Sequence, residues 1–538
     1  MERTRQHGNH SRLLTSTFPA LSDELKLEIF HFIRSRDDQG NARLVSRDWD
    51  RLMRPRMWRK LSTDMESIME DESIELLEQH ACFRDIRVLT VCAYPPTTDA
   101  LFSRFMHLLG DDQLLEYNGV KHSPLSLNQL HSLLRHQSKL RSFCARFDFS
   151  KTATTEQLSS WRAEEETALF TTSLRSLRSL RIYFRDGAIN SAPQLTRQNW
   201  EVTCSIILIN CAPLLDSLEI FGLRSMSSLL GGAPQSDTLP RTLTRILLAD
   251  VDLSGLEERL AKAINLFSLR SLTIEYCKAL VPFVQALATS IQYTGAELKV
   301  LTIRTQKREK RHHTRHMHHA VQDLLSSFEG LENLELDFGS GRSSDWEANL
   351  AGHHTLKRLL VSYRRMDDHL GRILEQCPNV RYFAYKSLSI ALGDVADCQL
   401  PSTLPIELCA GLDAIAAAPT ITTLRMLYAP GFGDDRANTM SPAWIEKAGR
   451  LAHRVATLVL THLHLNLSNV KMLALSPTLR WENSEGDGNL HYYPHYFYKL
   501  RISNIDGRDM VEAAPLRNYA VERPAAADFA GPGNELSW

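Results

Sequence analysis

The chain has 538 residues, more than one ordinary compact core holds, so its length predicts several domains or one extended array. Its 62 Lys and Arg balance its 63 Asp and Glu, and no apolar run reaches the roughly 20 residues of a membrane span, so we expect no nucleic-acid partner and no membrane. The nine cysteines are scattered and the first 17 residues lack the apolar core of a secretory signal, which predicts a cytoplasmic or nuclear protein with reduced thiols.

Behind a disordered start over residues 1–17, residues 18–62 predict a small helical module. Ser22 is suited to cap a helix, and Asp23 and Glu24 would lie in its first turn, where the helix dipole favours anions. Apolar residues then recur at helical spacing on two faces, with Leu25, Ile29, Phe32 and Ile33 on one and Leu27 and Phe30 on the other. A short helix that is apolar on two sides needs two burial partners, and one of them could be another protein.

A second helix is predicted after Asp37, Asp38 and Gly40, which we expect to break the first one. Asp38 is its expected cap, and its apolar face is expected to hold Val45, Trp49 and Leu52. Pro55 is expected to interrupt this helix, because proline disfavours helical backbone before it. A short turn with Met57, Trp58 and Leu61 follows.

Three segments of this module resemble an F-box: Leu21–Ile33, Leu44–Trp49 and Met57–Leu61. The family pattern opens with Leu-Pro and continues through Glu-Leu and Ile. It then has Leu-Val-Ser/Cys with a basic residue and an aromatic, and closes on a Trp/Phe-basic-Leu group. Ser22 stands where the family usually has the proline. The resemblance implies docking of a Skp-type adaptor through Leu21, Ser22, Leu25, Ile29, Leu44, Val45, Trp49 and Trp58. The alternative is that these helices merely cap the remainder of the chain.

The remainder repeats one unit, apolar-x-x-apolar-x-apolar, which predicts a half-buried strand that returns through a helix. From Leu215 to Val380 the unit recurs every 24 to 33 residues. We predict an α/β solenoid, a degenerate leucine-rich-repeat horseshoe over residues 171–500, after linker helices and early degenerate repeats over residues 63–170. A set of unrelated α/β units is less suited to strands this short and this polar. The copies begin at Ile86, Leu177, Leu215, Leu243, Leu269, Leu298, Leu331, Leu356, Val380, Ile421 and Val455.

Two further patterns concern the ends of these repeats. Before Leu215 and Val380, a Cys near the end of a helix is followed by a proline, which would end the helix and direct the chain into a strand. The aromatic run over residues 491–498 is predicted to cover the open end of the solenoid, although it could also stack against a ligand. Residues 501–538, which are rich in Ala, Pro and Gly, are predicted to be disordered.

No catalytic motif is present, so we expect no enzyme activity and no cofactor. The basic run over residues 307–319 places His312 and His316 one helical turn apart, a spacing that could hold a metal together with Glu309. Its lysines and arginines would repel a cation, so we expect no metal. We interpret the run as an exposed loop or helix start, with a patch for an acidic partner as the alternative.

Alternate strand positions of a horseshoe line its open sheet face. The residues that we expect to contact a target protein there are Tyr183, Glu219, Phe221, Arg304, Arg358 and Tyr382. With the F-box resemblance, they predict the substrate-recognition subunit of an SCF-type cullin–RING ubiquitin ligase. The alternative is a leucine-rich-repeat scaffold without a ligase role.

Overall fold

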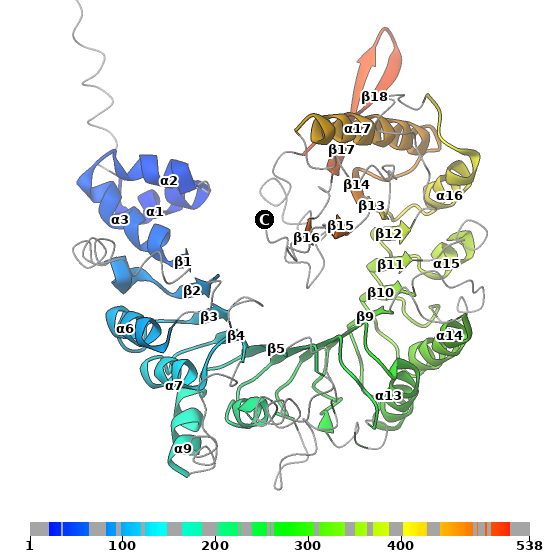
Figure 1. Cartoon of the computed structure of the whole chain (residues 1–538). Coiled ribbons are helices and arrows are strands. Elements are labelled where there is room, and N and C mark those ends of the chain that lie inside the picture. The colour runs from blue at the N-terminus through cyan, green and yellow to red at the C-terminus, as the bar shows by residue number, and fades with distance from the viewer. Residues whose placement is uncertain are drawn as a thin grey trace, which may run out of the picture. The chain divides into compact units, whose positions relative to one another are not determined.

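The computed structural model (Figure 1) describes residues 21–33, 36–63, 82–92, 98–119, 124–147, 164–184, 202, 204–223, 226, 239–255, 259, 263–305, 311–338, 350–362, 370–386, 402–427, 442–476, 481–482, 490–491 and 496–516. These residues form two compact units. The first unit comprises residues 1–223 and 228–242, and the second comprises residues 224–227 and 243–538.

The first unit begins with three helices and continues as parallel strands that pair in chain order. The helices are α1 (Asp23–Phe32), α2 (Arg36–Arg43) and α3 (Arg47–Trp58). The strands are β1 (Lys60–Thr63), β2 (Val88–Val91), β3 (Glu116–Gly119), β4 (Ser142–Arg146), β5 (Ser179–Tyr183) and β6 (Ser217–Phe221). Between them lie η2 (Cys82–Asp85), α6 (Asp99–Leu109), α7 (Leu127–His136) and α9 (Glu164–Ser173).

The return helices follow from local sequence signals. A capping box starts α7: the Ser126 side chain accepts from the Gln129 N–H, and the Gln129 side chain accepts from the Ser126 N–H. Leu127, Leu130 and Leu134 then bury one side of the helix. Burial of each such leucine contributes roughly 1.5–3 kcal/mol relative to exposure.

The second unit continues the same pattern. Its strands β7 (Arg245–Ala249), β8 (Ser271–Glu275), β9 (Val300–Arg304), β10 (Asn333–Asp337), β11 (Arg358–Ser362), β12 (Tyr382–Lys386), β13 (Thr423–Leu427) and β14 (Met472–Ser476) pair in parallel and in order. Its helices are α13 (Leu280–Thr294), α14 (Arg311–Ser326), α15 (Leu370–Gln376), α16 (Ile406–Ala416) and α17 (Pro442–Leu465). The remaining strands are β15 (Trp481–Glu482), β16 (Leu490–His491), β17 (Tyr496–Ile505) and β18 (Arg508–Pro515).

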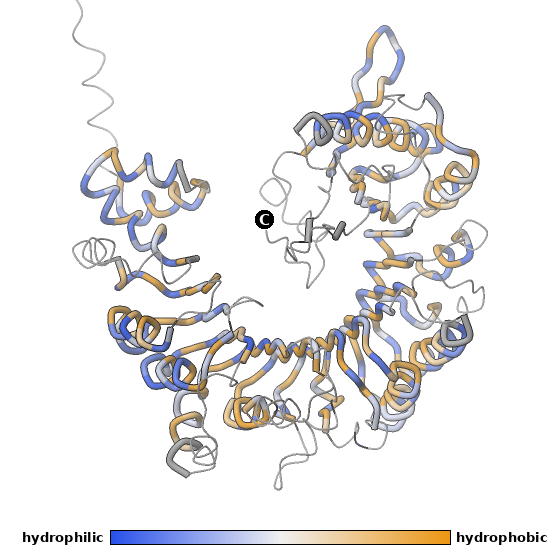
Figure 2. Tube along the Cα trace, in the orientation of Figure 1, coloured by the Kyte–Doolittle hydropathy of each residue, from blue (hydrophilic) through white to orange (hydrophobic). Residues whose placement is uncertain are grey.

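Strand register identifies the repeat. Leu334 of β10 pairs with Leu301 of β9 and with Leu359 of β11, so equivalent positions of the six-residue unit lie side by side and are buried. The first apolar residue of the unit, such as Leu331, is also buried. Figure 2 shows apolar residues in orange along the strands and on the helices. The prediction of an α/β solenoid of leucine-rich units is therefore confirmed.

The repeated Cys-Pro junction has the predicted structure. Cys211 and Cys377 are both buried where a helix ends. The backbone then turns, with the Val380 N–H donating to the carbonyl of Cys377 at 3.2 Å. Burial raises the pKa of the Cys377 thiol to about 12, so the side chain is a neutral packing group.

One predicted strand is wrong. The unit that begins at Val455 lies inside α17, and the strand in its place is β14, whose unit begins at Val470. Within α17, residues Ala448, Ala452, Val455 and Val459 are all buried at spacings of three and four. The spacing of apolar residues in the six-residue unit also fits one face of a helix. Because the buried residues here continue at helical spacing beyond the six residues of the unit, the segment forms a helix.

The start of the solenoid was also misplaced. The first strand, β1, begins at Lys60, inside the range 18–62 given to the helical module. Strands β3 and β4 also lie within repeat units, which begin at Leu114 and Leu140. These two units were not predicted from the sequence. In β3 the unit ends on Asn118 and Gly119 instead of an apolar residue, which hides the pattern.

The predicted disordered tail is wrong over residues 501–515, which form the end of β17 and all of β18. The two strands pair antiparallel across Asp506 and Gly507, whose φ angles of 52° and 76° suit a two-residue hairpin turn. The aromatic residues Tyr496 to Tyr498 begin β17, which pairs with β14 as the predicted end cover. Residues 1–17 and 517–538 lie outside the described residues.

None of the helices in the described part of the chain is long and apolar enough to cross a membrane.

Candidate docking site on the N-terminal helices

Helix α1 forms as its sequence predicts. The Leu25 N–H donates to the Ser22 hydroxyl at 3.4 Å, and Asp23 and Glu24 occupy the first turn. The helix ends at Phe32, and the Ile33 N–H donates to the carbonyl of Phe30 at 3.1 Å. Ser22 thus serves as a helix cap at the position where the F-box pattern has proline.

The second and third helices differ from the prediction. Asp38 and Gly40 lie within α2 and do not separate two helices. The cap of α3 is Ser46, whose hydroxyl accepts from the Trp49 N–H at 3.2 Å. Pro55 lies inside α3, which continues through Met57 and Trp58. Ser46, and not Asp38, caps this helix because the Ser46 hydroxyl can accept from N–H groups of the first turn that have no partner within the helix.

A small core holds these helices together. Phe30 of α1, Ala42 of α2 and Met53 of α3 are buried against one another, with Ile33, Trp49 and Leu52 beside them. The Phe30 and Trp49 rings meet edge to face, with centroids 4.8 Å apart. This core is small for an independent domain, so the contact between α1 and α3 needs further support.

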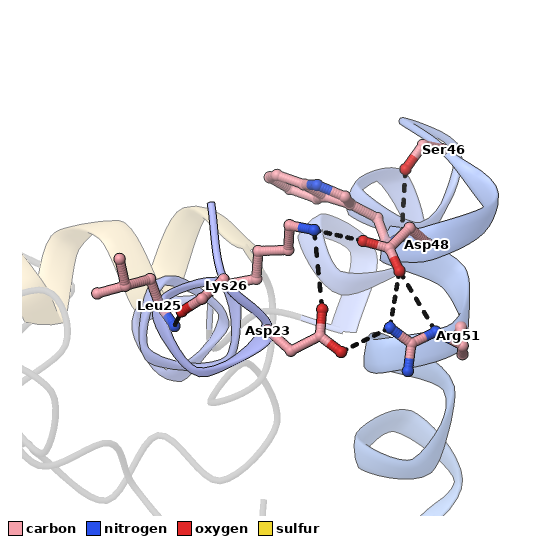
Figure 3. Close-up of polar contacts among 8 residues, drawn as sticks. Asp23, Leu25, Lys26, Ser46, Asp48 and Arg51 are labelled. Atoms are coloured by element: carbon pink, nitrogen blue, oxygen red, sulfur yellow. Dashed lines mark hydrogen bonds and ion pairs between the residues drawn. The ribbon is translucent and has the colours of Figure 1, made fainter. Parts of the chain in front are cut away.

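That support is a charged network between α1 and α3 (Figure 3). Lys26 of α1 is buried and donates to Asp48 of α3 at 2.5 Å. Arg51 of α3 donates to Asp48 of the same helix and also to Asp23 of α1, each at 2.7 Å. The hydrogen bonds from Lys26 and then from Arg51 lower the pKa of Asp48. The network fixes α1 against α3 through four charged side chains.

Large apolar side chains of this module remain exposed. On α1, Leu25 is 54%, Leu27 47%, Ile29 36% and Phe32 78% exposed. In the turn before α3, Leu44 is 84% and Val45 61% exposed. These six side chains are called the apolar set below. Exposed apolar groups so close in sequence are typical of a surface that another protein covers.

The residues predicted to bind an adaptor fall into two groups. Leu25, Ile29, Leu44 and Val45 belong to the apolar set, whereas Ser22 is the exposed cap and Leu21 beside it is half-buried. Trp49 and Trp58 are half-buried. Trp49 packs within the core, so its ring supports the module from inside. Leu27 and Phe32, which helical spacing placed on two different faces of α1, are both exposed.

In the first unit, three predicted target contacts, Tyr183, Glu219 and Phe221, lie on the neighbouring strands β5 and β6. Arg181 of β5 donates to Glu219 of β6 at 2.6 Å, and both side chains are about four-fifths buried. Two residues further along both strands, the rings of Tyr183 and Phe221 stack with centroids 4.6 Å apart. This face therefore presents a half-exposed aromatic pair beside a neutralised ion pair.

In the second unit, Arg304 of β9 lies between two carboxylates. It contacts Glu275 of β8 at 2.8 Å and Glu335 of β10 at 2.6 Å. Burial lowers the pKa of Arg304, but Glu335 and Glu275 more than offset that effect and keep the guanidinium charged. Residue spacing in the sequence predicted that Arg304 lies on the open sheet face. Only the pairing register of the three strands places both Glu275 and Glu335 beside it.

The other two predicted target contacts of this unit are both half-buried. Arg358 is half-buried on β11. Tyr382 of β12 packs against Met472, Ala474 and Phe497, and burial raises the pKa of its hydroxyl. Much of the Tyr382 ring is thus used to cover the end of the array, which limits what it offers to a target.

From Arg311 onward, the histidine-rich run forms the beginning of α14, where His316 is exposed and His318 is buried. The side chains of Glu309 and His312 lie outside the described residues. Among the side chains that are described, no group of three or more His, Cys, Asp or Glu is arranged to hold a metal.

No protein-family model matches the chain, and no curated protein matches it. Among solved structures, the crystal structure of an internalin from Listeria monocytogenes is similar at 16% sequence identity and a TM-score of 0.32. The match covers 68% of this chain and 92% of the internalin chain. The repeat fold described above rests on strand register and burial.

Proposed function

We propose that this chain is the substrate-recognition subunit of an SCF-type cullin–RING ubiquitin ligase. Its N-terminal helices dock a Skp-type adaptor, and its repeats hold a target protein. The observation that carries the proposal is the apolar set: six large side chains, 36–84% exposed, on α1 and in the turn before α3, within a sequence that resembles an F-box. A module with so small a core gains stability when a partner covers such residues.

The arrangement on α1 supports docking by one face. Leu25, Ile29 and Phe32 recur at intervals of four and three residues, so they lie on the same side of the helix. The charged network with Lys26 and Asp48 holds the helix from another direction. Full burial of one such apolar side chain contributes roughly 1.5–3 kcal/mol.

The proposed mechanism makes and breaks no covalent bond within this chain. A target held on the open sheet face is brought close to the conjugating enzyme that the cullin–RING assembly recruits. Proximity raises the effective concentration of target lysines at the reactive thioester. The half-exposed Tyr183 and Phe221 pair and the Arg304 cluster are the proposed target contacts in the two units.

The test is adaptor binding by the full chain, with Leu25→Asp, Ile29→Asp as the disrupting double variant. We expect the variant to lose binding by roughly 100-fold or more, because two charges would be buried in the interface without partners. The measurement is isothermal titration calorimetry with the purified adaptor. Both side chains are exposed in the unbound chain, so folding is expected to be unchanged.

The matched control is Leu214→Asp, Ile406→Asp, which alters two exposed apolar residues outside the module, 48% and 84% exposed. It should bind as the unaltered chain does. If the unaltered chain shows no adaptor binding, the ligase proposal fails and a repeat scaffold remains. Equal losses in both double variants would also contradict docking through α1.

A further inference from the structure

The β17–β18 hairpin projects from the end of the second unit beside α17 (Figure 1). One of its faces covers that helix: the Tyr498 ring lies 5.8 Å from His453, Asp509 lies 3.7 Å from His464, and Ala513 is fully buried. Every residue from Arg501 to Met510 is exposed. The outer part of the hairpin therefore extends into solvent, where an isolated two-stranded ribbon is only marginally stable.

Backbone pairing shows which groups of β18 face outward. The Leu516 N–H donates to the carbonyl of Phe497, which makes those two residues a hydrogen-bonded pair of the hairpin. Such pairs alternate along an antiparallel ladder. Asp509, Val511 and Ala513 therefore direct their N–H and C=O groups away from β17. On the other side of the hairpin, the Leu500 N–H donates to Lys471, as the same alternation requires.

This outer edge has no partner strand in the part of the chain that the structure describes, since β18 ends the strand order. Natural edge strands are usually blocked by proline, by lysine or by a covering segment. On β18 the proline is Pro515, at the base beside the buried Ala513. The exposed middle of the edge, around Met510, has no such block, and Met510 itself is 53% exposed.

The charges on the solvent face of β18 are self-complementary. Arg508 and Glu512 lie two residues on either side of Met510, so all three point to the same face. In an antiparallel pair of two β18 strands centred on Met510, Arg508 of each copy is opposite Glu512 of the other. The same register places Asp509 opposite Val511, and these are the residues whose backbone groups face outward. Centring on Val511 instead would place Arg508 opposite Ala514 and lose both charge pairs.

We propose that the outer edge of β18 binds the same edge of a second copy of this chain, in an antiparallel register centred on Met510. The two hairpins form one four-stranded sheet related by a two-fold axis. The contact is small beside a standard interface of about 1,600 Å², so the dimer is weak and depends on concentration. It uses neither the N-terminal helices nor the sheet face proposed for target binding.

The first test uses sedimentation velocity of the full chain over a wide concentration range. We expect reversible dimerisation. Arg508→Glu should weaken it by roughly tenfold or more, because a like charge then faces Glu512 at two places. Lys499→Glu makes the same change of charge on an exposed residue of β17, away from the edge, and should leave dimerisation unchanged.

The second test fixes the register. The Met510 residues of the two copies would form a non-hydrogen-bonded pair, with Cα atoms about 4.5 Å apart, a separation that a disulfide spans. Met510→Cys should therefore give a covalent dimer under mild oxidation. Lys499→Cys and the unaltered chain, which retains its own cysteines, should not.

Val511→Pro supplies an independent variant, because it removes an outward N–H and leaves the bonds of the hairpin intact. We expect it to abolish dimerisation, with circular dichroism confirming the fold. If Val511→Pro fails to fold, Arg508→Glu and Met510→Cys decide the question. A chain that stays monomeric at every concentration overturns the proposal. So does a dimer that Arg508→Glu leaves intact or that Met510→Cys does not cross-link.

Discussion

At the scale of single residues, Lys26 explains how a small module keeps its shape. A lysine on a surface helix is normally exposed, yet this one is buried and bonded to Asp48 across two helices. Breaking such a pair by removing one partner leaves a charge without compensation. The ion pairs of Asp50 with Arg54 and Arg43 add a second set within the module, at 2.6 and 2.5 Å.

These carboxylates predict acid sensitivity of the module. The hydrogen bond from Lys26, then that from Arg51, lowers the pKa of Asp48, and that from Arg54, followed by Arg43, lowers the pKa of Asp50. A lowered folded-state pKa stabilises the fold above the ordinary value of 3.8, and this contribution is lost as pH falls through the lowered values. Hydrogen exchange of α1 and α3 peptides, corrected for intrinsic rates, should show protection that decreases below about pH 4.

Asp48→Asn is the variant that isolates this effect. It removes one titrating group, so protection should depend less on pH. Among the described residues it leaves Lys26 with one carboxylate in ion-pair range, Asp23 at 3.8 Å, so protection at neutral pH should be lower. Protection that is the same at pH 3 and pH 6 in the unaltered chain would contradict the role of the network.

At the scale of elements, α3 contains a proline where helices rarely tolerate one. Pro55 has no N–H to donate to the carbonyl of Arg51, one turn earlier, and yet the helix continues to Trp58. The burial of Met53 and the contact of Trp49 with Phe30 hold the part of α3 before Pro55 against α1, and Arg56 after it donates to the carbonyl of His31 at 3.3 Å. Tertiary packing thus outweighs a local preference that predicted an end to the helix.

Pro55→Ala should therefore stabilise the module. Restoring the N–H and the helix propensity should add roughly 1–3 kcal/mol to its free energy of unfolding. Pro55→Gly restores the N–H without the propensity and should give a smaller gain, by about 1 kcal/mol. Hydrogen exchange of α3 peptides measures both. Lower protection in Pro55→Ala would mean that proline at this position is required for packing.

At the scale of the whole molecule, a solenoid must cover its last apolar layer. In the second unit β17 does so: its Phe497 packs on Met472 and Ala474 of β14, and Tyr382 packs against the same cluster. Antiparallel pairing of β17 with β14 also satisfies the backbone edge that the parallel strands leave open.

Deleting residues 496–538 should consequently destabilise the second unit and promote aggregation through the exposed edge of β14. Deleting residues 517–538 alone keeps the hairpin and is the control. We expect the longer deletion to lower the thermal unfolding midpoint by several degrees, since it removes several buried side chains, among them Phe497 and Tyr498. Equal midpoints for the two deletions would contradict an end-covering role.

Much of this fold could be predicted because its signals are local and repeated. Units such as Leu298–Ile303 and Leu331–Leu336 became the strands of a parallel ladder, and Ser22 capped α1. Predictions were wrong where the same apolar pattern fits both a strand and a helix, as at Val455. They were also wrong where amino-acid composition alone suggested disorder, as in the β18 segment. Alanine and proline there suggested disorder, but a turn at Asp506 and Gly507 together with α17 gives the segment a partner to pair with and a surface to pack on.

The candidate sites depended more on tertiary structure. The sequence alone determined that the chain is a repeat array after a helical module, and that this module has apolar residues on two faces. It could do so because the spacing of apolar residues along the chain directly shows the repeat. Only the tertiary structure decided that Lys26 is buried while Phe32 is exposed, that Arg304 joins Glu275 and Glu335, and that β18 presents a free edge. Each of these features depends on which residues from distant parts of the sequence become neighbours. Strand register and the packing between elements determine those neighbours.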